Sequence, residues 1–114
     1  MTVIVDTSSS MASRMFLVKD KLHKLLQEQL RHKRRFNIIK FDSKVIQWRE
    51  SQVDCNDINL DNAWQWVKSL SVGGSTNTLA AIKVGLSDPD VNGIYLLSDG
   101  RPDQVRLFAF MVFS

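Results

Sequence analysis

Side chains with carboxylate and hydroxyl oxygens occur at three points of the sequence, each beside an apolar run or a glycine pair. Asp6, Ser8 and Ser10 lie in the segment DTSSS, Thr76 lies in GGSTNT, and Asp99 lies in SDG directly after the apolar run GIYLL. Carboxylate and hydroxyl oxygens are hard ligands, which suit Mg²⁺, or Mn²⁺ as a substitute. No His or Cys accompanies them, which disfavours zinc.

The spacing within DTSSS also has a chemical meaning. Alternation along an extended loop places Asp6, Ser8 and Ser10 on one side of the chain. Hydroxyl ligands are neutral, so an ion held partly by Ser8, Ser10 and Thr76 keeps positive charge and an open coordination position. These residues therefore predict a metal that binds a protein partner through an exposed Asp or Glu of that partner.

Such a site needs elements that bring distant segments to one place. Residues 2–6 fit a buried strand because they are apolar and end in an acidic residue. Helical periodicity runs through residues 13–29. Two strands at residues 35–41 and 45–48 are joined so closely that they form an antiparallel hairpin. Residues 51–59 are polar and predicted to be irregular. A second helix is expected at residues 60–70 and a third at residues 78–86, capped by Thr76 or Asn77. A fourth strand, residues 93–97, is predicted to stop at Ser98-Asp99-Gly100.

Strands that alternate with helices predict an α/β fold with a doubly wound, mostly parallel sheet and helices on both of its faces. Ligands of such sheets bind outside the carboxyl ends of the strands, where the strand order reverses. The first and fourth strands are the natural neighbours across that point. Asp6 and Asp99 are therefore expected to face each other over one crevice.

Together, the segments DTSSS, GGSTNT and LLSDG resemble the metal-ion-dependent adhesion site of von Willebrand factor type A (vWA) domains, whose motif is DxSxS, a loop Thr and a strand-end Asp. The match falls on Asp6, Ser8, Ser10, Thr76 and Asp99. The resemblance implies that the Ser and Thr side chains touch the metal, while the Asp side chains act through water or orient the Ser hydroxyls. Thr78 is the alternative threonine, but its spacing from the glycines favours Thr76. The longer pattern is similar to the intracellular type 3 group of vWA proteins, without separating its A and B members.

The resemblance covers residues 1–104, which are interpreted as a partial vWA domain. The family continues through two further strands with their helices, whereas this chain ends in a divergent apolar tail, residues 105–114. The tail is typical of a truncated product or an alternative splice end. The fourth strand is then expected to be an open sheet edge, prone to association. The tail either folds back antiparallel on that strand or lies over a face of the sheet.

Composition and charge narrow the function classes. The chain has 114 residues, room for one domain, and a net charge of +3, which is too weak a bias to indicate nucleic-acid binding. Cys55 is the single cysteine, so no internal disulfide is expected. No signal peptide is expected, and the sequence contains no apolar run long enough for a membrane span. These features favour a cytoplasmic protein with neither a membrane nor a nucleic-acid partner.

Two enzyme-like interpretations compete with the interaction module. A Mg²⁺-dependent phosphotransferase would use Asp6 as its nucleophile, but the expected second Asp two residues later is Ser8. A nucleotide site in the glycine-rich loop lacks both the P-loop lysine and the GxGxxG spacing. The basic run at residues 31–35 is interpreted as a solvated helix end. Trp64 is expected in the core and Trp66 partly exposed. No catalytic residue is assigned, and the protein is not expected to be an enzyme.

Overall fold

The computed structural model describes residues 1–74, 78–87, 93–101 and 104–111 of the chain, and the side chains of Ser10, Thr78 and residues 98–111 lie outside that description. Six strands form the sheet, in the order β3-β2-β1-β5-β6, with β4 pairing separately with β2. Their bounds are β1 Thr2–Asp6, β2 Arg35–Phe41, β3 Val45–Gln47, β4 Val53–Asp54, β5 Gly93–Arg101 and β6 Gln104–Met111.

The central strands are parallel and the outer ones antiparallel. β1 pairs in parallel with β2 on one side and with β5 on the other, with Asp6 opposite Phe41 and Val5 opposite Leu97. The strand order therefore reverses at β1, and the predicted adjacency of the first and fourth strands is confirmed. β3 pairs antiparallel with β2, which confirms the predicted hairpin.

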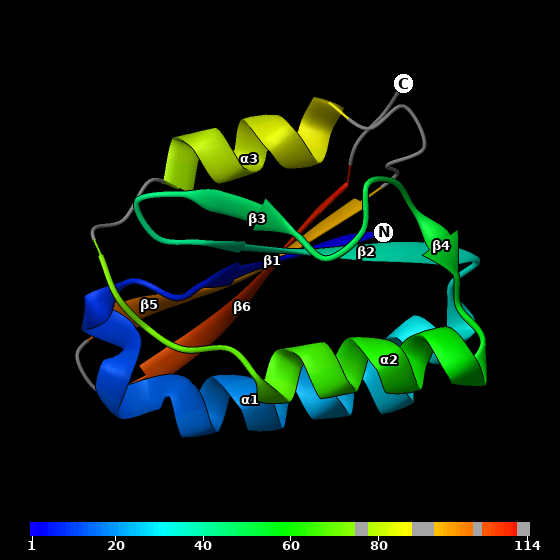
Figure 1. Ribbon diagram of the computed structural model, residues 1–114, viewed down its shortest axis with the longest axis horizontal. Helices are drawn as coiled ribbons and strands as arrows, with labels where there is room; N and C mark the ends of the chain where they lie inside the picture. Colours follow the sequence, from blue (N-terminus) through cyan, green and yellow to red (C-terminus); the bar gives the residue numbers. More distant parts are fainter. Residues whose placement is uncertain (75–77, 88–92, 102–103, 112–114) are drawn as a thin grey trace.

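Helices cover both faces of this sheet, as the sequence predicts for a doubly wound α/β fold. Helices α1 (Met15–Lys24) and α2 (Asp57–Lys68) lie on one face, and α3 (Thr78–Ser87) lies on the other (Figure 1). α1 is preceded by the 3₁₀ segment η1 (Ser9–Arg14) and followed by the π-helical turn η2 (Leu25–Gln29) and a short 3₁₀ turn, η3 (Leu30–His32).

Two hydrophobic clusters fill the spaces between the sheet and its helices. Alternate residues of β1 divide between them, since Val3 and Val5 belong to the α1–α2 side and Ile4 to the α3 side. The same alternation divides β2. Phe36 and Ile38 lie in the cluster on the α1–α2 side, and Phe41 lies in the cluster on the α3 side. Both faces of each central strand are buried, which is why β1 contains the apolar run 3–5 and β2 carries buried apolar residues toward both faces.

The first helical region is less regular than predicted. Residues 13–29 were expected to form one α-helix, but regular α-helix occupies only Met15–Lys24. The segment η1 tightens the entry, and η2 widens the exit, where Leu25 and Leu26 are both buried. Hydrophobic spacing alone does not distinguish these variants because their side chains still return to one face every few residues.

The prediction that residues 51–59 are irregular is wrong. They contain β4, and α2 begins at Asp57 rather than Leu60. The side chain of Asn56 caps this helix by accepting a hydrogen bond of 2.8 Å from the backbone N–H of Asn59. The first turn is largely exposed, including Ile58 at 74%, so the buried apolar periodicity starts only at Leu60.

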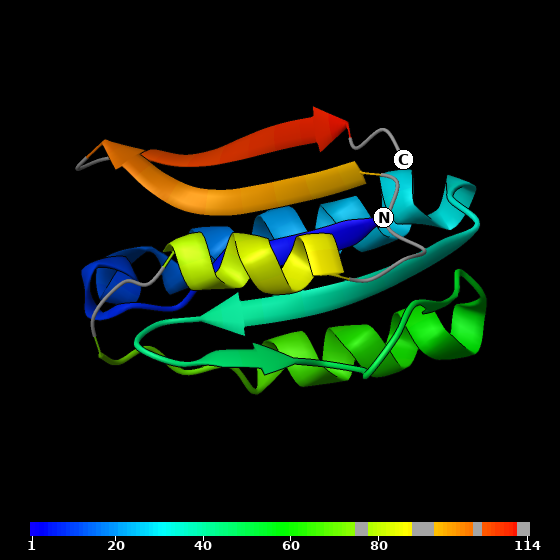
Figure 2. The ribbon, with the colours of Figure 1, turned by 90° about the horizontal axis from the view of Figure 1, so that it is seen from above.

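The fourth strand does not stop at Ser98-Asp99-Gly100, as predicted. β5 continues to Arg101 because its end pairs antiparallel with β6, with Ser98 opposite Arg106 and Asp99 opposite Val105. Of the two expected arrangements of residues 105–114, the antiparallel one is therefore present over residues 105–111. The expectation that the fourth strand is an open edge is wrong, because β6 lies beside it (Figure 2).

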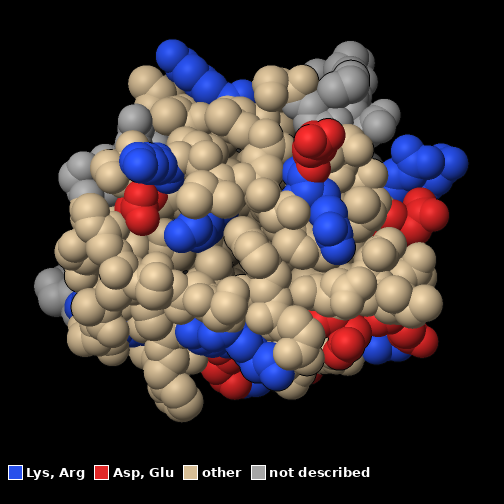
Figure 3. All heavy atoms as spheres, in the orientation of Figure 1, with Lys and Arg blue, Asp and Glu red and all other residues tan. Residues whose placement is uncertain are grey.

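The charge distribution on the surface agrees with the modest net charge of the chain. On the face drawn in Figure 3, basic and acidic side chains are interspersed rather than gathered by sign. Within the described ranges, no helix is both long enough and apolar enough to cross a membrane. Trp66 is partly exposed, as predicted, whereas Trp64 is only half-buried rather than fully in the core, and both pack against the α1–α2 cluster.

Candidate functional site

The end of β1 holds a buried carboxylate that is bonded to the loop after it. Asp6 is 3% exposed and Ser8 is 1% exposed. One oxygen of Asp6, Oδ1, accepts hydrogen bonds from the Ser8 hydroxyl at 2.6 Å and from the Ser8 backbone N–H at 2.9 Å. The carboxylate thereby sets the rotamer of Ser8. Because the hydroxyl hydrogen points to Asp6, the lone pairs of Ser8 Oγ are directed elsewhere.

Thr7, between these two residues, anchors the loop to the neighbouring strand. Its backbone N–H and its hydroxyl both donate to the carbonyl of Phe41, at 2.8 and 3.1 Å. Phe41 ends β2, and it lies opposite Asp6 in the parallel register. The loop after β1 is therefore fixed to the carboxyl end of β2, at the edge where α/β sheets bind ligands.

The glycine-rich segment is docked onto the same loop. The backbone N–H of Gly73 donates to the carbonyl of Thr7, and the backbone N–H of Ser9 donates to the carbonyl of Gly74, both at 3.0 Å. These two bonds join segments more than sixty residues apart in the sequence. The first and second of the three predicted segments therefore meet, through Thr7, Ser9, Gly73 and Gly74.

The remaining predicted site residues are described only in part. Ser10 lies in η1, directly after the loop, and Asp99 lies near the end of β5, but for both only the backbone is described. Thr76 lies outside the described residues, and the side chain of the alternative, Thr78, does so as well. The structure thus places Asp6 and Ser8 together, and it brings β5 beside β1 two residues before Asp99, where Leu97 pairs with Val5.

The chemistry of this loop fits a hard divalent cation. Asp6 and Ser8 supply oxygen donors, and Asp6 already orients the Ser8 hydroxyl as a ligand-supporting carboxylate would. Among the described residues there is no group of three or more His, Cys, Asp and Glu side chains that could hold a metal.

A third loop, which the sequence interpretation did not assign to the site, supports it from the side. The turn between β2 and β3 is closed by hydrogen bonds from Lys44 N–H to the Asp42 carboxylate at 2.9 Å and from Asp42 N–H to the Lys44 carbonyl at 3.0 Å. Gly74 lies against this turn, where an added Cβ would be 2.9 Å from the Ser43 hydroxyl oxygen. The sequence contains both parts of this contact, the turn residues Asp42-Ser43-Lys44 and the glycine pair, but their contact with each other depends on the tertiary fold.

Gly74 also has a backbone conformation that other residues adopt only at a cost. Its φ is +75°, the left-handed region, whereas an added Cβ on Gly73 would meet nothing within 4 Å. We expect Gly74→Ala to lower the free energy of unfolding by about 1–2 kcal/mol, because of the left-handed conformation. Gly73→Ala is the matched control and is expected to be nearly neutral. Urea unfolding of both variants tests this, and equal losses would show that the φ of Gly74 is not what fixes the loop.

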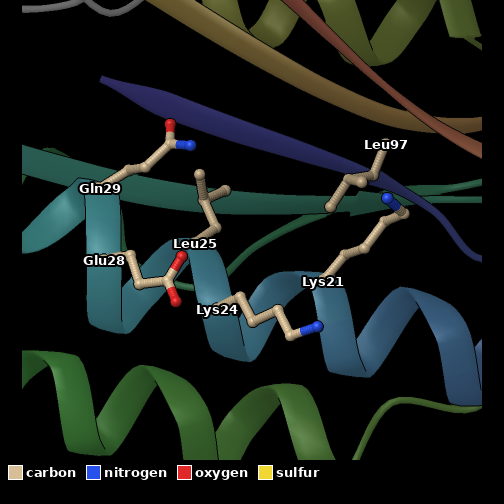
Figure 4. A pocket seen from close by; sticks show the side chains of 6 residues that line it. All are labelled: Lys21, Lys24, Leu25, Glu28, Gln29 and Leu97. Carbon is tan, nitrogen blue, oxygen red and sulfur yellow. The ribbon is translucent and has the colours of Figure 1, made fainter.

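A small hollow lies between β5 and the helical segments α1 and η2. It has a volume of about 160 Å³. Figure 4 shows Leu25 pointing from η2 toward the sheet and Leu97 pointing from β5 toward the helices. Its lining residues are Lys21, Lys24, Leu25, Glu28, Gln29 and Leu97. Both signs of charge surround an apolar floor, so the hollow favours no class of ligand.

Cys55 does not have the surroundings of a catalytic nucleophile. It is half-buried and packs against the α1–α2 cluster. Burial raises the pKa of its thiol, the charge of Asp54 raises it further, and the N-terminal ammonium opposes both. The thiol is therefore protonated at neutral pH, whereas reactive cysteines need the thiolate. Cys55 therefore contributes to the fold as a small, partly buried apolar side chain.

Comparison with known proteins gives one consistent family. The family described as von Willebrand factor type A domain matches residues 1–110. The chain is 47% identical to human von Willebrand factor A domain-containing protein 3B over 102 residues, covering 90% of the chain. It is 38% identical to human von Willebrand factor A domain-containing protein 3A over 102 residues, covering 89% of the chain. It is 29% identical to the bovine inter-alpha-trypsin inhibitor heavy chain H1 over 114 aligned positions. The matches span 8%, 9% and 12% of those three proteins.

Proposed function

The chain belongs to the von Willebrand factor type A domain family, and from this membership we propose that it is an interaction module that binds a carboxylate of a protein partner through Mg²⁺. Domains of this family commonly mediate protein–protein interaction and are generally not enzymes. The observation that carries the proposal is the buried Asp6 carboxylate, which holds the Ser8 hydroxyl at 2.6 Å at the carboxyl end of β1.

The proposed ligand set consists of Asp6, Ser8, Ser10, Thr76 and Asp99. Asp6 and Ser8 support it by their geometry, and Ser10 and Asp99 support it by their positions in η1 and β5. Thr76 follows Gly74, whose carbonyl accepts the hydrogen bond from Ser9. Mn²⁺ would fit the same oxygen donors.

The partner's chemistry follows from the charge of this ligand set. Three of its five members are neutral hydroxyls. The charge of the divalent ion is therefore balanced only by the two carboxylates, and incompletely where a carboxylate binds through water. A bound cation of this kind retains Lewis acidity and attracts an anionic oxygen. We propose that an exposed Asp or Glu of the partner completes the coordination.

We also propose that the protein works in the cytoplasm.

Short peptides test this proposal without a known partner. A peptide with one central Asp and its Asn counterpart would be added to the isotopically labelled protein in Mg²⁺ or in chelator, while amide resonances are followed by NMR. We expect the amides of Thr7, Ser8 and Gly73 to shift only with the Asp peptide in Mg²⁺. Equal shifts with the Asn peptide, or in chelator, would exclude a metal-bridged carboxylate.

One further assay distinguishes the phosphotransferase alternative from the interaction module. An enzyme that uses Asp6 as a nucleophile would release p-nitrophenol from p-nitrophenyl phosphate in the presence of Mg²⁺. We expect no release above that of an Asp6→Asn variant. A metal-dependent rate that disappears in Asp6→Asn would favour the enzyme and contradict the interaction module.

A further inference from the structure

The two edges of the sheet differ strongly in what they present. At one edge is β3, which has three residues, and at the other is β6, which has eight (Figure 2). Among the described residues, β6 pairs only with β5. The sequence of β6, QVRLFAFM, contains one charged residue, Arg106, and neither Pro nor Gly. Natural sheets usually protect their edges by short strands, charges or prolines, so β3 is a protected edge and β6 is not.

We propose that β6 is the interface through which two copies of this chain form a dimer, by antiparallel pairing of their β6 strands. A second copy fits this edge because backbone pairing along a regular strand requires few particular side chains. The pairing is isologous, so the same surface serves both copies and the assembly closes at two. After pairing, the outer edges of the joined sheet are the two short β3 strands, which offer little for further growth.

Symmetry restricts the register of such a pair. Along an antiparallel ladder, opposite residues alternate between hydrogen-bonded and non-hydrogen-bonded pairs. A two-fold axis must relate pairs of the same kind, so it passes through one pair, and in that pair a residue lies opposite its own copy. Centring the pair on Leu107 places Arg106 opposite Phe108, and centring it on Phe108 places Arg106 opposite Phe110. Both registers use nearly the whole strand and keep the two arginines apart. Centring on Arg106 would place like charges opposite each other, which is unfavourable.

One substitution opposes both favourable registers. In Phe108→Lys, the new lysine lies opposite its own copy when the pair is centred on Phe108 and opposite Arg106 when it is centred on Leu107. The matched control is Ile46→Lys, which places the same charge in β3 at the other edge, where Ile46 is 45% exposed.

Sedimentation equilibrium in chelator measures this association apart from any metal binding. We expect a monomer–dimer equilibrium for the unchanged protein and for Ile46→Lys, and a dissociation constant at least about tenfold larger for Phe108→Lys. Hydrogen exchange supplies a second measurement on the unchanged protein. The amides of residues 104–111 should exchange more slowly at high than at low protein concentration, while those of β2 should not change.

Several outcomes would overturn the proposal. They are a monomer at every concentration, open-ended aggregation instead of a dimer, or exchange in residues 104–111 that does not depend on concentration. If Phe108→Lys fails to fold by circular dichroism, Leu107→Lys replaces it, because that lysine lies opposite its own copy when the pair is centred on Leu107 and diagonal to its copy when the pair is centred on Phe108. A dimer of undiminished affinity in the folded variant would likewise place the interface elsewhere.

Discussion

Asp6→Ala is expected to abolish Mg²⁺ binding. The substitution removes a proposed ligand and also the acceptor that holds the Ser8 hydroxyl and backbone N–H at 2.6 and 2.9 Å. Loss of one carboxylate from a site with two leaves too little negative charge to dehydrate a divalent ion. Isothermal titration calorimetry should therefore show heat of binding for the unchanged protein and none above dilution for the variant.

Two controls separate this effect from loss of structure. Asp61→Ala removes an exposed carboxylate of α2 and should bind Mg²⁺ as the unchanged protein does. Asp6→Asn keeps an oxygen that accepts hydrogen bonds from Ser8, so the loop keeps its support while the charge is lost. Asp6→Asn should fold normally and still bind Mg²⁺ much more weakly. Identical uptake by Asp6→Ala and the unchanged protein would show that the site has been assigned to the wrong residues.

Phe36→Ala is expected to have the largest effect on stability. The Phe36 ring is fully buried and stacks on Trp48, with ring centroids 5.2 Å apart and an angle of 25° between the planes. The guanidinium of Arg49 lies 4.6 Å from the centroid of the Trp48 ring on which Phe36 stacks. Removing the ring leaves a cavity and an unsupported indole, and large-to-small changes of this kind cost about 3–5 kcal/mol. That is a large part of the roughly 5–15 kcal/mol that stabilises a typical domain.

The same substitution at another phenylalanine is the natural control. Phe16 of α1 is 80% exposed, so Phe16→Ala should change the free energy of unfolding by less than about 0.5 kcal/mol. Urea unfolding followed by far-UV circular dichroism compares the two without relying on the fluorescence of Trp48. Similar losses in both variants would mean that Phe36 is not part of a tightly packed core.

The strands of this fold could be predicted well where burial and sequence pattern agree. β1 and β2 place buried apolar residues on both of their faces and are followed by polar loops, and both were predicted with their observed bounds. Prediction failed where tertiary pairing decides. Ser98-Asp99-Gly100 has the composition of a turn, yet it continues as a strand because β6 pairs with it. The start of α2 was missed because its first turn is exposed, although Asn56 is a typical capping residue.

The candidate site likewise has a part that could be predicted from the sequence and a part that could not. The types and spacing of Asp6 and Ser8 were sufficient to predict that the carboxylate and hydroxyl act together. The docking of Gly73 and Gly74 onto Thr7 and Ser9 could not be derived from spacing, because it depends on how two distant loops meet at one edge of the sheet. The support that the turn at residues 42–44 gives to Gly74 was missed for the same reason.

A thermal melt in Mg²⁺ and in chelator tests the central proposal most directly. A ligand that binds only the folded state stabilises it by about 2.7 kcal/mol at a hundred times its dissociation constant. For a domain of this size that corresponds to a rise in Tm of about 10 °C. We predict this rise for the unchanged protein and a much smaller one for Asp6→Asn, which binds Mg²⁺ more weakly. Equal melting temperatures in Mg²⁺ and chelator for the unchanged protein would contradict a metal site at the end of β1.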